Sequence, residues 1–107
     1  MIDMINQGDL PTAIFCASDP IAIGALRALQ ERNIRVPEDI SLIGFDDIKA
    51  ASFTTPPLTT VFAPADLMGE YGANIVYNLL SKYSSPTPVQ ITLPCVLIER
   101  ESCKEVD

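Results

Sequence analysis

One stretch of the chain decides its fold: Val36-Pro37-Glu38-Asp39-Ile40-Ser41-Leu42-Ile43-Gly44-Phe45-Asp46-Asp47-Ile48. The part from Ile40 to Phe45 is almost continuously apolar, which is typical of a parallel strand that is covered on both faces of its sheet. Gly44 lets the backbone pack closely against a neighbour just before the two acids. Ligands of open α/β sheets bind at the carboxyl ends of the strands, so Asp46 is predicted to lie where a ligand would bind.

A strand and a helix precede this stretch and complete a βαβ unit. Thr12 to Ala17 has an apolar centre and is predicted to be a short buried strand. Ser18 or Asp19 can be the N-cap of the next helix, with Asp19 the preferred candidate, and Pro20 suits a first helical turn because its missing N–H is not needed there. With a helix from about Pro20 to Arg32, the two strands become parallel neighbours. The sequence therefore predicts an α/β fold, a Rossmann-like parallel sheet flanked by helices.

The remaining elements follow from caps, prolines and apolar periodicity. We expect a short first helix that stops at Gly8, a left-handed stop at Asn33, a helical turn from Asp47 to Ala51, strands at Leu58 to Phe62, Val89 to Leu93 and Val96 to Ile98, and a long helix from about Ala65 to Lys82. Ser84 to Pro88 is expected to be a loop. The charged residues from Glu99 to Asp107 are expected to be frayed.

Composition excludes several classes of function. The 107 residues suffice for one domain at most, with 48% hydrophobic and 20% charged residues as in ordinary globular proteins. A net charge of −7 without a Lys/Arg cluster opposes DNA binding by this chain itself. The chain contains no His and no apolar run of about 18 residues, so the usual zinc sites and membrane spans are not expected. Three cysteines without CxxC spacing, Cys16, Cys95 and Cys103, are expected to be free thiols in a cytoplasmic protein.

Catalytic motifs are not found in the sequence. It contains no nucleophile elbow, P-loop or GxGxxG turn, and Cys95 has no basic neighbour that would stabilise a thiolate. We therefore expect no enzyme activity, no cofactor and no metal site.

The stretch from Val36 to Ile48 closely resembles the VPxDISLIGFDD segment of the LacI/GalR family of bacterial transcription regulators. The resemblance continues through Ala17 to Leu29, Pro56 to Val61 and Leu97 to Ser102, and covers roughly nine-tenths of the chain. It implies a partial type I periplasmic-binding-protein-like fold. Residues 1–107 would then be the carboxyl-terminal portion of the effector-binding domain, without the helix-turn-helix headpiece and the upstream half of that domain.

The resemblance also implies an effector site. The first acid of the GFDD segment reaches the effector in such regulators, and it falls on Asp46. Ser18 stands where sugar-responsive members commonly have Asn, and Phe62 is the best aromatic candidate for a sugar ring to rest on. Phe15 and Phe45 are more typical of a core, and Asp47 is expected to be a cap or a surface acid.

A dimer interface is predicted on the helix from Pro20 to Arg32. Ala22, Leu26 and Leu29 form the stripe that packs on the sheet, so Ile21 and Ile23 should be exposed in a monomer. The resemblance implies that this helix pairs with a second subunit, with contact candidates Ile21, Ile23, Leu26 or Arg27, and Phe53. Isolated surface isoleucines without a partner are the alternative.

The function implied is that of the sensing and dimerising part of a homodimeric regulator. A small carbohydrate-like effector would shift two lobes, and the absent headpiece would release or grip operator DNA. A periplasmic sugar-binding protein of transport shares the fold and is the alternative. An enzyme of flavodoxin-like topology is a third possibility, which the missing phosphate-binding glycine loop disfavours.

Overall fold

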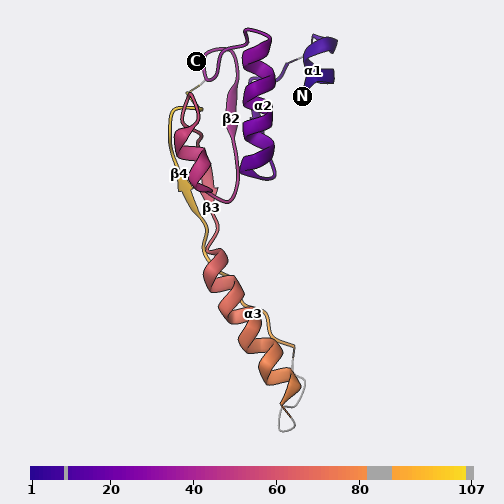
Figure 1. Cartoon of the computed structure of the whole chain (residues 1–107), viewed down its shortest axis with the longest axis vertical. Helices are drawn as coiled ribbons and strands as arrows, with labels where there is room; N and C mark the ends of the chain where they lie inside the picture. Colours follow the sequence, from indigo (N-terminus) through magenta and orange to yellow (C-terminus); the bar gives the residue numbers. More distant parts are fainter. Residues whose placement is uncertain (9, 82–87, 106–107) are drawn as a thin grey trace. The chain divides into compact units, whose positions relative to one another are not determined.

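The computed structural model describes residues 1–8, 10–81 and 88–105 (Figure 1). The chain forms two compact units, one made of Met1–Phe62 with Val96–Asp107 and the other of Ala63–Cys95. Within the described residues, no helix is long and apolar enough to cross a membrane.

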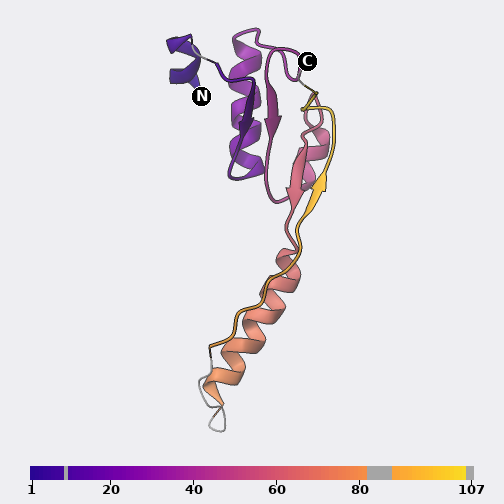
Figure 2. The ribbon, with the colours of Figure 1, turned by 180° about the vertical axis from the view of Figure 1, so that it is seen from behind.

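The first unit is built around short strands. Its elements are α1 (Ile2–Gln7), β1 (Ala13–Phe15), α2 (Asp19–Glu31), β2 (Ser41–Ile43), the 3-10 helix η1 (Lys49–Phe53), β3 (Thr60–Phe62) and β4 (Val96–Ile98). Strands β1 and β2 are parallel, in the register Ala13 to Ser41 and Phe15 to Ile43 (Figure 2). A parallel bridge joins Ile43 to Thr59, and β3 pairs antiparallel with β4. The predicted α/β fold with a βαβ unit is thus confirmed.

Helix α2 packs on the sheet through one apolar stripe. Ala22, Ala25, Leu26 and Leu29 are buried, together with Leu42 of β2, in a core completed by Cys16, Val36, Ile40, Ala51 and Leu58. The spacing of three and four residues places the helical side chains on one face, as the sequence predicted. The helix ends before Asn33, whose φ of 57° is the expected left-handed stop. Gly8, with a φ of 76°, ends α1 in the same way.

The second unit contains α3 (Ala65–Leu80) and the segment that returns towards β4. The helix starts where the sequence predicted, after Pro64. It carries the expected apolar face, and none of its described side chains is buried within this chain. Val89 to Leu93 does not form a strand, which corrects that prediction. The predicted loop at Ser84 to Pro88 lies almost wholly outside the described residues.

The segment from Glu99 to Cys103 is held in the first unit, so the prediction that it is frayed was wrong there; residues 106–107 lie outside the described residues. Ser102 is fully buried, and its hydroxyl accepts a hydrogen bond from Thr59 N at 2.8 Å and donates one to Leu42 O at 2.5 Å. Leu42 N donates in turn to Ser102 O at 2.8 Å. One serine thus satisfies buried backbone groups of β2 and of the residue before β3, which a charged, solvated tail would not do.

Candidate functional site

The carboxyl ends of three strands meet at one place in the first unit. Asp19 N, just after β1, donates to Phe45 O after β2, and Asp46 N donates to Val61 O of β3, both at 2.8 Å. These two bonds bring the segments that carry Ser18, Asp46 and Phe62 together. This is the strand-end position that the βαβ geometry predicted for a ligand site.

Asp46 and Asp47 form a left-handed turn at this place. Their φ angles are 106° and 52°, in a region that residues with a Cβ adopt rarely and at a cost of about 1–3 kcal/mol each. The Asp46 side chain is exposed, and no described residue forms a hydrogen bond or ion pair with its carboxylate. A strained turn therefore presents an open carboxylate at the carboxyl end of the sheet.

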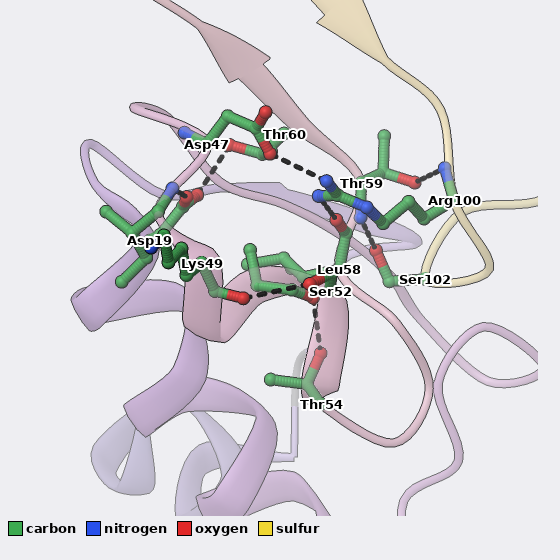
Figure 3. Close-up of polar contacts among 12 residues, drawn as sticks. Asp19, Asp47, Lys49, Ser52, Thr54, Leu58, Thr59, Thr60, Arg100 and Ser102 are labelled. Carbon is green, nitrogen blue, oxygen red and sulfur yellow. Dashed lines mark hydrogen bonds and ion pairs between the residues drawn. The ribbon is translucent and has the colours of Figure 1, made fainter.

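Asp47 is neither a helix cap nor a free surface acid. Its Oδ1 accepts a hydrogen bond from Nη2 of Arg100 at 2.7 Å, and the two side chains are only 21% and 19% exposed (Figure 3). Arg100 also donates through Nη1 to Leu58 O at 2.8 Å and through its backbone N to Thr59 Oγ1 at 3.0 Å. The arginine therefore ties the turn to the segment that leads into β3.

Asp19 is fully buried, and the prediction that it caps α2 was wrong. Ser18 occupies the N-cap position without a side-chain cap bond, and Asp19 is the first helical residue. The Asp19 carboxylate points elsewhere: Oδ1 accepts from Thr60 Oγ1 at 2.5 Å, and Oδ2 accepts from Ile48 N at 2.8 Å (Figure 3). No local pattern predicts these partners, because Thr60 and Ile48 are 41 and 29 residues away from Asp19.

Gly44 is required beside this carboxylate. A Cβ on Gly44 would collide with Asp19 Oδ1 and would lie 3.1 Å from Leu58 Cδ2. The Asp19 side chain cannot swing away without losing its two hydrogen bonds. This explains why a glycine interrupts the apolar strand just before the acids.

Gly44→Ala is expected to destabilise the protein by about 1–3 kcal/mol, the usual cost of forcing extra volume into a packed interior. Gly24→Ala is the matched control, since no atom lies within 4 Å of its Cβ position in α2. In a helix that change should be neutral or stabilising by up to about 1 kcal/mol. Urea denaturation of the two variants tests this, and equal midpoints would contradict it.

Aromatic side chains surround the strand ends but are not core residues. Phe15 is 62% exposed and meets Phe45 edge to face, with ring centroids 6.4 Å apart. Phe62 is also exposed, at the end of β3. The expectation that Phe15 belongs to the core was wrong, because it lies at the open end of β1. Phe15 and Phe62 thus expose apolar surface at the carboxyl ends of β1 and β3.

The predicted interface residues divide into exposed and buried ones. Ile21 and Phe53 are 57% and 84% exposed, and Arg27 pairs with Glu31 at the surface. Ile23 is only half-exposed and packs against the core, which corrects its predicted exposure. Leu26 is buried at 3% exposure, so it is a core residue with no accessible surface to offer a partner.

The cysteines and acids do not form a metal site among the residues that the structure describes. Cys16 is buried, Cys103 is half-buried and Cys95 is exposed, all as free thiols. Burial raises the pKa of the Cys16 thiol, which favours its uncharged, unreactive form.

The sequence is similar to known regulators along nearly its whole length. Residues 1–103 match the family described as periplasmic binding protein-like domain. The HTH-type transcriptional repressor MelR of Bacillus subtilis is 44% identical over 99 residues, which are 92% of this chain and 28% of that repressor.

Solved structures share the fold. The lac repressor dimer bound to operator and the anti-inducer ONPF has a TM-score of 0.84 and 36% identity, over 95% of this chain and 35% of that one. The complex of the transcriptional regulator CelR with cellobiose has a TM-score of 0.83 and 35% identity, over 92% and 30%. The chain thus spans about a third, or less, of the proteins it resembles.

Proposed function

Because this chain belongs to the family of periplasmic binding protein-like domains, we propose that it is the carboxyl-terminal part of the effector-binding domain of a LacI/GalR-type transcription regulator. The observation that carries the proposal is the open carboxylate of Asp46, held in a left-handed turn where three strand ends meet. Strained backbone of this kind persists where the surrounding structure fixes a functional group in place.

We infer that the effector is carbohydrate-like. A carboxylate on a fixed turn can accept hydrogen bonds from two adjacent hydroxyl groups, and such charge-assisted bonds are roughly twice as strong as neutral ones. Ser18 offers a further hydroxyl, and Phe62 an apolar surface for the carbon face of a ring. The transcriptional regulator CelR, which has a similar fold, has been solved in complex with cellobiose.

The effector signal would leave this unit through β3 and β4. The chain passes out of the first unit after Phe62 and returns to it at Val96, so these strands are its two connections to the second unit. The turn contacts the first of them directly, since Asp46 N donates to Val61 O. An effector bound at the turn would therefore act on β3 and, through it, on the grip of the headpiece on operator DNA.

DNA binding itself is assigned to the headpiece outside this chain. The net charge of −7 opposes contact with phosphates. The regulator would act in the cytoplasm, as a sensor and not as an enzyme.

Operator binding tests the proposed function. An operator is first selected from a random DNA pool with the complete protein, and its affinity is then followed by fluorescence anisotropy with cellobiose and a panel of other mono- and disaccharides. We expect one saccharide to change operator affinity at least fivefold, within the usual range of allosteric coupling. If none of the saccharides changes the affinity of the protein for its operator, the carbohydrate assignment is contradicted.

We further propose that Ile21 of α2 and Phe53 of η1 contact a second subunit. Both are large apolar side chains that this chain leaves exposed. Ile21→Lys with Phe53→Lys should raise the dimer dissociation constant about 100-fold or more, because like charges would meet across a two-fold axis. Sedimentation of the complete protein checks this. Thr12→Lys, which adds one such charge at an exposed residue next to β1, is the control and should leave the dimer intact. An unchanged double variant would exclude this face.

A further inference from the structure

We propose that Asp19 is a positioning residue, which fixes the Asp46 carboxylate in the orientation that an effector meets. This inference rests on the proposed function. Asp19 fastens both ends of the turn that carries Asp46: its N–H donates to Phe45 O, and its Oδ2 accepts from Ile48 N, each at 2.8 Å. Residues 45 and 48 bracket Asp46 and Asp47, so Asp19 holds the turn at both of its ends.

Burying the Asp19 carboxylate has a free-energy cost. The Asp19 side chain is 0% exposed, and no cation among the described residues pairs with it. A buried carboxylate without a cation is costly, and an apolar residue would fill the same space at a lower cost. What an apolar residue cannot do is accept hydrogen bonds from Ile48 N and Thr60 Oγ1 together.

The turn needs such fastening because its backbone is strained. Asp46 and Asp47 both have positive φ, which a free chain would leave for negative values. Releasing Ile48 would let the turn relax and move the Asp46 carboxylate. Thr60 adds a second hold, since its Oγ1 donates to Asp19 and also accepts from Asp47 N at 3.4 Å (Figure 3).

Hydrogen-bond chemistry separates positioning from a merely structural role. In Asp19→Asn the remaining oxygen can still accept from Ile48 N, and the amide can donate to Thr60, whose hydroxyl can reverse its role. In Asp19→Asn combined with Thr60→Val the buried amide nitrogen has no acceptor, so the side chain is expected to leave this orientation and to lose the bond from Ile48 N with it. Asp19→Ala provides no acceptor at all.

The test uses the complete protein and the saccharide of the panel to which the wild type responds, with calorimetry for effector affinity and anisotropy for operator affinity. We expect Asp19→Ala and the double variant to bind that saccharide at least about tenfold more weakly, and Asp19→Asn to stay within about threefold of the wild type. Thr54→Val is the matched control for the loss of a threonine hydroxyl, because Thr54 bonds only to Ala51 O and Pro56 O, away from the turn. It should leave effector affinity unchanged.

Hydrogen exchange of the Ile48 amide gives a second readout that needs no effector. It should speed up at least tenfold in Asp19→Ala and in the double variant, and little in Asp19→Asn. Effector affinity within threefold of the wild type in Asp19→Ala, or slow Ile48 exchange in that variant, would overturn the proposal. Equal losses of effector affinity and operator affinity in the double variant would also overturn it, as the mark of a general structural role. If the wild type responds to no saccharide, the carbohydrate assignment fails, and the exchange rates alone then decide whether Asp19 holds the turn.

Discussion

Replacing Asp46 with alanine is expected to abolish the response to effector while leaving operator affinity unchanged. The open carboxylate at the strand ends would lose its charge-assisted hydrogen bonds to effector hydroxyls. Such bonds in a closed site contribute about 1.5–3 kcal/mol, which corresponds to about 10- to 150-fold in effector affinity. Anisotropy of labelled operator, titrated with complete protein in the presence and absence of the saccharide that the wild type recognises, measures both quantities.

Asp3→Ala provides the matched control, since Asp3 is an exposed aspartate of α1. It should respond to effector as the wild type does. A normal response by Asp46→Ala would remove this residue from the site. Loss of operator binding without effector would show instead that the substitution disturbs the fold.

Replacing Arg100 with alanine is expected to destabilise the protein by about 2–4 kcal/mol. The variant leaves the Asp47 carboxylate four-fifths buried without its cation, and Leu58 O without the Nη1 donor. Removing one partner of a buried pair costs about 3–5 kcal/mol, and the remaining exposure of the two side chains lowers that figure. Urea denaturation should show the loss as a lower midpoint with an unchanged slope.

Two comparisons identify the cause of that loss. Arg35→Ala removes the arginine from another ion pair, which Arg35 forms with Asp39 in solvent. In the wild type the hydrogen bonds from Arg35 lower the pKa of Asp39 to about 2. The urea midpoint of Arg35→Ala should barely change, because water screens the exposed ion pair. Adding Asp47→Ala to Arg100→Ala removes the unpaired charge and should recover part of the stability. No recovery would mean that the backbone contacts of Arg100, and not the ion pair, account for the effect.

The sequence predicted what local patterns determine. The apolar stripe of α2, the left-handed stop at Asn33 and the two parallel strands follow from periodicity and backbone preference, and all were confirmed. The meeting of Ser18 and Asp46 at one sheet edge follows from βαβ geometry alone. These features depend on neighbours in sequence or on topology, so a single sequence contains them.

The polar contacts that fix the turn could not be predicted. Asp19 looked like a helix cap because aspartate before proline usually is one, whereas its partners, Ile48 and Thr60 of β3, are distant in sequence. Arg100 and Ser102 lie in a charged tail whose composition suggested fraying, yet each satisfies buried groups near β3. Ile23 was misassigned because helical periodicity does not show that the half-buried flank of α2 also contacts the core.

A crystal structure of the complete protein with the saccharide that changes its operator affinity tests the central claim most directly. We predict that two adjacent hydroxyl groups of the sugar donate to the Asp46 carboxylate at about 2.5–2.8 Å, with Ser18 and Phe62 beside the same ring. The turn should keep its positive φ angles in the complex. A saccharide bound elsewhere, with the Asp46 carboxylate open to solvent, would contradict the account.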